Sequence, residues 1–100
     1  MYNHTRSSKV EIKGIRDGLL ITLGEGEWPD LRDVLLDSID QKSDFFRGAR
    51  LALDVGNLVL HAAELGYLRD ALSSRGIALW AVVGNSPLTE QTARTLGLDT

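Results

Sequence analysis

The chain has 100 residues, of which 43% are hydrophobic and 25% charged, with a net charge of −3 and no cysteine. This length and mix are typical of one globular domain, and the lack of cysteine excludes disulfides and thiolate metal sites. Both charges are spread along the chain, which argues against nucleic acid as a partner, and the apolar runs are too short for insertion into a membrane.

The first nine residues are polar and hold no apolar stretch of the kind that a signal peptide needs. We therefore expect residues 1–9 to be a flexible lead-in and residues 10–98 to form the domain. A chain without cysteine fits the reducing cytoplasm, where we expect the protein to act.

Two short strand patterns open the domain. Residues 10–18 read Val-Glu-Ile-Lys-Gly-Ile-Arg-Asp-Gly, and Leu-Leu-Ile-Thr-Leu follows over 19–23. Their alternation of apolar and polar residues predicts two antiparallel strands with one packed face and one wet face. Asp17-Gly18 supplies the positive-φ backbone that a tight hairpin turn needs.

Helix and strand patterns alternate over the rest of the chain. Helical spacing predicts helices over residues 28–41 and 61–75, and a third from Pro87, capped by Ser86, to about Gly97. Strands are expected over 51–55 and 77–83, and the second is apolar enough to be buried on both faces. The order ββαβαβα predicts a single small α/β domain. Its mixed sheet would hold an N-terminal antiparallel hairpin and parallel strands joined by right-handed helical crossovers.

Three aromatic positions have specific expectations. Trp80 lies in the most apolar strand and is expected in the core. Trp28 is expected to pack at the start of its helix, with an exposed binding anchor as the alternative. At least one ring of Phe45-Phe46, in the connection after the first helix, is expected inside.

Residues able to perform chemistry do not gather in any motif. Four aspartates recur at helical spacing over 30–40, which indicates a solvated helix face more than a divalent-ion site. Gly24-Glu25-Gly26 lacks the lysine of a phosphate-binding loop, and His4 and His61 are too far apart to indicate a metal site. We therefore expect no enzymatic activity, no metal and no cofactor.

The hairpin is the better candidate for a functional surface. Lys13 and Arg16 place two positive charges beside its turn, and Gly14 lies between them. An exposed basic hairpin on an acidic domain indicates a surface that binds a partner, and the alternative is an ordinary solvated turn. The outer strand of the hairpin could also pair with a second copy of the chain in a homodimer.

Several short motifs occur in a characteristic order. They are Ile12-Lys13-Gly14 and Asp17-Gly18-Leu19 in the hairpin, Val55-Gly56-Asn57 after the third strand, and Ala-Arg-Thr-Leu-Gly-Leu over 93–98. In this order and spacing, residues 10–98 resemble the family of N-terminal domains of the bacterial septum-site-determining protein MinC. The resemblance implies a non-enzymatic cell-division inhibitor that binds the tubulin-like GTPase FtsZ and antagonises its polymer assembly.

The same resemblance implies which residues and partners are involved. Lys13 and Gly14 match the family's motif and are the implied FtsZ contacts, and we add Arg16 from its place in the same turn. MinD would bind only through a C-terminal domain that this chain does not contain.

The alternative function is that of an anti-sigma-factor antagonist (STAS) domain, which shares a small α/β layout. Its phosphorylated serine or threonine would fall in Asp54–Leu58, which has no hydroxyl side chain.

Overall fold

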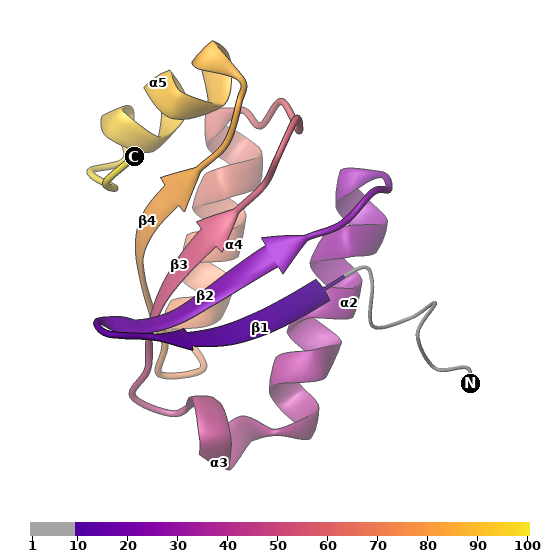
Figure 1. Ribbon diagram of the computed structural model, residues 1–100, viewed down its shortest axis with the longest axis vertical. Helices are drawn as coiled ribbons and strands as arrows, with labels where there is room; N and C mark the ends of the chain where they lie inside the picture. The colour runs from indigo at the N-terminus through magenta and orange to yellow at the C-terminus, as the bar shows by residue number, and fades with distance from the viewer. Residues whose placement is uncertain (1–9) are drawn as a thin grey trace.

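One sheet, covered by helices on a single face, makes up the fold (Figure 1). The computed structural model describes residues 10–100, and the lead-in expected at residues 1–9 lies outside the described residues. The strands are β1 (Val10–Ile15), β2 (Gly18–Leu23), β3 (Arg50–Asp54) and β4 (Ala78–Val83). The helices are α2 (Trp28–Gln41), α3 (Ser43–Phe46), α4 (Ala62–Ser73) and α5 (Pro87–Thr95).

The topology of the sheet confirms the predicted fold class. The strands lie in the order β1-β2-β3-β4, with β1 and β2 antiparallel and the other neighbours parallel. Because each parallel strand is added on the same side of the previous one, right-handed crossovers bring α2 and α4 to one face. Figure 1 shows both helices behind the sheet, with α5 beside the end of β4.

The core fills the space between the sheet and the helices. Its fully buried side chains come from β2 and β3, from α2, from α4 and from the short helix α3, and they include Ile21, Leu51, Leu53, Leu31, Leu35, Leu65, Leu68, Leu72 and Phe46. The Trp28 side chain is 6% exposed at the start of α2, as expected. Phe46 is buried and Phe45 is 61% exposed, so one ring of this pair packs inside.

The expectation that β4 is buried on both faces is wrong. Ala78 and Val83 are exposed and Trp80 is half-buried, because no helix covers the second face of the sheet within the described residues. Pairing between β3 and β4 is also irregular, since Leu51 pairs with Leu79 and Ala52 pairs with Ala81. Trp80 is the extra residue of this bulge, so the alternation that runs from Ala78 to Trp80 is interrupted at Ala81, which is buried directly before the buried Val82.

The C-terminal residues add a short bridge to the outer edge of β4. Asp99 donates its backbone N–H to Trp80 O at 2.9 Å, and Val82 donates to Asp99 O at 2.9 Å. Among residues 10–100, no helix combines the length and apolar content that crossing a membrane requires.

Candidate partner-binding surface

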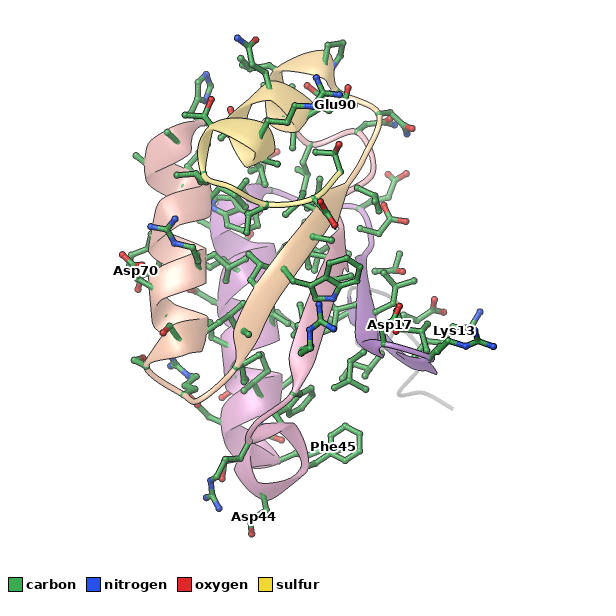
Figure 2. The ribbon with its side chains drawn as sticks, turned by 90° about the vertical axis from the view of Figure 1, so that its left-hand side faces the viewer. Lys13, Asp17, Asp44, Phe45, Asp70 and Glu90 are labelled. Atoms are coloured by element: carbon green, nitrogen blue, oxygen red, sulfur yellow. The ribbon has the colours of Figure 1, made fainter. Side chains whose placement is uncertain are left out.

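The hairpin holds all three residues that the sequence analysis selected. Lys13 pairs with Leu20 and Gly14 pairs with Leu19, while Arg16 lies in the turn. Paired residues of neighbouring strands share a face, so Lys13 belongs to the face that the helices leave open. All three residues are exposed, and Figure 2 shows Lys13 and Asp17 together at the outer end of the hairpin, away from the helices.

The turn brings β3 close to this end of the hairpin. Gly18 has a φ of 140°, and a Cβ atom built on it would lie 2.2 Å from the carbonyl oxygen of Arg50. Only glycine meets both demands, which are a positive φ and close approach of another backbone. The positive φ therefore falls on Gly18 alone in the Asp17-Gly18 pair, and Arg50 lies directly beside the turn.

Arg50 is a candidate residue that the sequence analysis missed. Its guanidinium carbon lies 5.0 Å from the centroid of the Trp80 ring, a cation–π distance. Its position at the start of an apolar strand gives a weak signal by itself, because only the register of β3 against β2 places it next to Gly18 at the hairpin turn. We call Lys13, Arg16 and Arg50 the basic end of the sheet.

The charges of the basic end are not neutralised within the domain. Arg32, Arg47, Arg69, Arg75 and Arg94 each have a carboxylate within ion-pair distance. In the described part of the chain, the cations without such a partner are Lys13, Arg16, Arg50 and Lys42. Three of these four lie at the basic end, where their charged groups are free to pair with carboxylates of a partner. The exposed carboxylates of Glu11 and Asp17 lie in the same hairpin, so its charges are mixed.

The exposed aspartates of α2 lie in the helical layer, on the other side of the sheet from its open face. Asp30, Asp33, Asp37 and Asp40 all face solvent, and no group of three or more acidic or histidine residues within 10–100 is placed to hold a metal ion. The hydrogen bond from Arg75 lowers the pKa of the Asp40 carboxyl below its ordinary value. The domain thus separates an acidic helix layer from the basic end of its sheet.

The open face of the sheet is apolar in its middle. Leu20, Ala52 and Ala81 form a row across three strands, and the two alanines are 6% and 5% exposed. Trp80 is half-buried on β4, and its Nε1 is a buried donor with no acceptor among the described residues. The two alanines are nearly buried, so the accessible side chains here include the half-buried Trp80 and the exposed Arg50, and aromatic residues and arginine are the types enriched in protein-binding surfaces.

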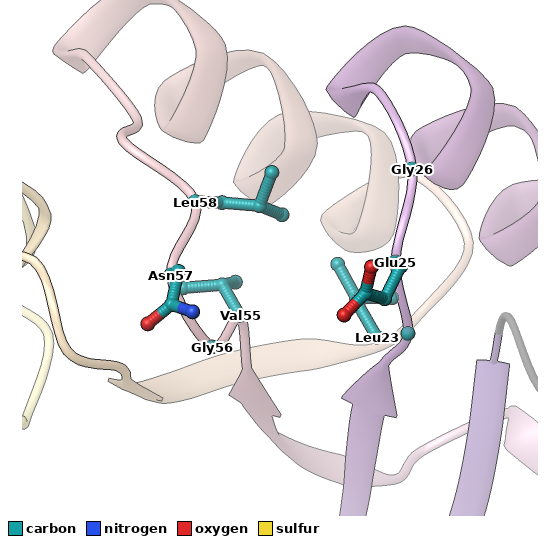
Figure 3. A pocket seen from close by; sticks show the side chains of 8 residues that line it. Leu23, Glu25, Gly26, Val55, Gly56, Asn57 and Leu58 are labelled. Carbon is teal, nitrogen blue, oxygen red and sulfur yellow. The ribbon is translucent and has the colours of Figure 1, made fainter.

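A separate pocket of about 370 Å³ lies beyond the carboxyl ends of β2 and β3 (Figure 3). Its lining is Leu23, Gly24, Glu25, Gly26, Val55, Gly56, Asn57 and Leu58, with Glu25 as the one ionisable side chain among them. Asp54 is not part of this lining, and its Oδ1 accepts a hydrogen bond from Gly56 N at 3.0 Å. The pocket therefore lacks the second ionisable group that general acid–base chemistry would use.

The loop at this pocket is also where a STAS domain would carry its phosphorylated hydroxyl. Asn57 holds the exposed position there, and its Oδ1 accepts a hydrogen bond from Asn85 Nδ2 at 2.9 Å. An amide engaged in this way offers no group for phosphorylation.

Comparison with known proteins relates the chain to septum-site-determining proteins. The family described as "Septum formation inhibitor MinC, N-terminal domain" matches residues 10–79. A protein of Brucella suis biovar 1 (strain 1330), named "Probable septum site-determining protein MinC", is 41% identical over 54 residues. That match covers 53% of this chain but only 22% of the relative, and no solved structure matches the chain significantly.

Proposed function

The chain belongs to the family of MinC N-terminal domains, and from this premise we propose that it inhibits cell division by binding FtsZ. Binding would antagonise the assembly of FtsZ polymers and so prevent septum formation at the wrong sites. The observation that carries the proposal is the basic end of the sheet, where Lys13, Arg16 and Arg50 have no carboxylate partner beside an apolar open face.

The mechanism that we propose is competition. A domain that occupies a contact between FtsZ subunits removes those subunits from the assembly equilibrium by mass action. The basic end would meet acidic groups on FtsZ, which orients the encounter. No covalent step is required, which fits a division regulator.

Gly14 supports this assignment in a different way. A Cβ atom built on Gly14 would meet no atom within 4 Å, and its φ is not in the positive region. The fold of the domain therefore does not require glycine at this position. We infer that Gly14 leaves the marginal strand β1 without a side chain on the face opposite to Lys13, so that the backbone of FtsZ can approach the edge of the hairpin closely.

The proposal extends to the cellular location and to a second partner. We propose that the domain acts in the cytoplasm, where FtsZ polymerises. We further propose that MinD binds a separate C-terminal domain of such proteins and not the surface described above.

Sedimentation of FtsZ polymers tests the proposal. The wild-type domain in several-fold excess should reduce the mass of sedimented polymer, and the Lys13→Glu/Arg16→Glu variant should lose most of this effect. Lys42→Glu/Arg47→Glu makes the same change of charge away from the hairpin and should inhibit like the wild type. Unchanged polymer mass with the wild-type domain would reject FtsZ inhibition.

The location of the site has its own criterion. Full inhibition by the Lys13→Glu/Arg16→Glu variant would show that Lys13 and Arg16 are not part of the binding surface. Circular dichroism should show the same thermal unfolding midpoint for both double variants, since all four side chains are exposed.

A further inference from the structure

The pocket beyond the carboxyl ends of β2 and β3 takes no part in the proposed function. Its volume of about 370 Å³ lies within the range of sites that hold small ligands or single side chains of a partner. The basic end lies at the other end of the same strands, and β2, with six residues, spans about 17 Å at the rise of an extended strand. The pocket is therefore a separate site.

The interior of this pocket is apolar on one side and carries a carboxylate on the other. The side chains of Leu23 and Val55 are 6% and 2% exposed, and that of Leu58 is half-buried. Figure 3 shows the carboxylate of Glu25 on one side of the pocket and the side chain of Leu58 on the other. A ligand in this space meets hydrocarbon and one negative charge.

The charge of Glu25 is not neutralised within the described part of the chain. Its side chain is exposed, and none of the ion pairs or side-chain hydrogen bonds among residues 10–100 includes it. Gly24 and Gly26 flank it, and Gly26 has a φ of 150°, in the region that favours glycine. A tight glycine turn thus presents the carboxylate.

A neighbouring acidic side chain excludes an anion as the ligand. Glu27 follows in the same connection and is the N-cap residue of α2, yet its side chain makes no capping hydrogen bond. Two unneutralised carboxylates repel phosphates and carboxylates. The group that satisfies both the charge and the apolar floor is a cation at the end of an aliphatic stem, because such a stem packs on hydrocarbon while its head meets the carboxylate.

The rim of the pocket offers a contact for a peptide backbone. Asn57 is exposed there, and its Oδ1 accepts a hydrogen bond from Nδ2 of Asn85. Nδ2 of Asn57 donates to no group among residues 10–100, so this donor is available to a carbonyl oxygen. A backbone carbonyl next to the cationic side chain is the complementary acceptor.

We propose that this pocket binds a lysine side chain of a protein partner. The ε-ammonium group pairs with Glu25, the methylene stem packs on Leu23, Val55 and Leu58, and the backbone of the partner accepts a hydrogen bond from Asn57. The proposal does not rest on FtsZ inhibition and is tested without FtsZ, so either one can fail alone.

Nuclear magnetic resonance titration of the ¹⁵N-labelled chain tests the site with three small probes. N-acetyl-lysine methylamide should shift the backbone amide signals of Gly24, Gly26 and Gly56 in a saturable way. N-acetyl-norleucine methylamide has the stem without the charge and should leave them unchanged. n-Butylammonium has the stem and the charge but no peptide group, and it should bind roughly 3-fold more weakly, because it loses one hydrogen bond.

Matched variants test the residues. Glu25→Gln keeps the shape of the side chain and should weaken binding of the lysine probe roughly 2- to 5-fold. Asp17→Asn makes the same change of net charge at the far end of β2 and should bind like the wild type. Asn57→Ala should lower the affinity for the lysine probe to that for n-butylammonium and leave the latter unchanged.

Three results would overturn the proposal. The first is a lysine probe that leaves the three glycine signals in place. The second is equal affinity in Glu25→Gln and Asp17→Asn, since the attraction would then be that of an acidic protein as a whole. The third is equal binding of n-butylammonium and the lysine probe, which would assign the pocket to free amines in place of a protein partner.

Discussion

Asp40 at the end of α2 and Arg75 just beyond α4 are joined by two hydrogen bonds. Nε of Arg75 donates to Oδ1 at 2.7 Å, and Nη2 donates to Oδ2 at 3.1 Å. Nη1 of the same guanidinium donates to the backbone oxygen of Ala71 at 2.9 Å, which fixes the side chain on its own helix. This fork-to-fork contact links the two helices that cover the sheet.

The Asp40–Arg75 contact predicts a dependence of stability on pH. Its hydrogen bond lowers the pKa of Asp40 in the folded protein below the ordinary value of 3.8. The stabilisation is therefore complete above that value and is lost as the pH falls through the lower folded pKa. In urea unfolding, Asp40→Asn should be less stable than the wild type near neutral pH, and this difference should shrink in acid. A difference that is constant with pH would contradict the assignment, and Asp37→Asn serves as the matched control on the same helix.

Thr89 joins the loop after β3 to α5. Its buried Oγ1 donates to Leu58 O at 2.8 Å and accepts from Leu60 N at 2.9 Å. Thr89→Val keeps the shape of the side chain but leaves Leu58 O and Leu60 N without their hydrogen-bond partner. This loss should lower the free energy of unfolding by about 1–3 kcal/mol. Thr95→Val removes an exposed hydroxyl that bonds within the same helix and should have a much smaller effect in chemical denaturation. Equal effects of the two substitutions would show that the bridge does not stabilise the fold.

Gly18 and Gly14 form a matched pair of glycines in one hairpin. Gly18→Ala should destabilise the domain by more than about 1 kcal/mol, because of the positive φ and the nearby Arg50 carbonyl. Gly14→Ala adds a methyl group in open space and should raise the free energy of unfolding by roughly 0.5 kcal/mol, since glycine is unfavourable within a strand. Thermal and urea unfolding measure both effects, and a neutral Gly18→Ala would mean that the turn relaxes without cost.

Arg50 should contribute to FtsZ binding although it lies outside the hairpin. Arg50→Gln removes its charge, and loss of one exposed charge contact of about 0.5–1 kcal/mol corresponds to a roughly 2- to 5-fold weaker affinity. Arg47→Gln is the control, because Arg47 is paired with Asp44 and lies outside the basic end. Fluorescence anisotropy with labelled FtsZ measures both, and equal affinities would exclude Arg50 from the surface.

Local sequence chemistry determined the order and type of the elements. The hairpin alternation predicted one packed and one wet face. Ile21 and Leu23 of β2 are buried as that pattern requires, whereas Ile12, which pairs with Ile21 from the marginal strand β1, is 37% exposed. Ser86 accepts a hydrogen bond from Thr89 N at 3.3 Å and Pro87 begins α5, as expected. The glycine after the second helix, Gly76, has the positive φ of a helix end. These features depend on a few neighbouring residues, so the sequence carries them directly.

Register and long-range packing decided the rest. Arg50 lies next to Gly18 at the hairpin turn only because β3 pairs with β2 in one register, and Ala81 lies opposite Ala52 only because β4 carries a bulge. An apolar run such as that of β4 does not indicate whether one or both faces of the strand are covered, since this depends on where the crossover helices lie. The sequence by itself thus determined the strands, the helices and the basic hairpin, whereas the composition of the surface around that hairpin arose from contacts between distant segments.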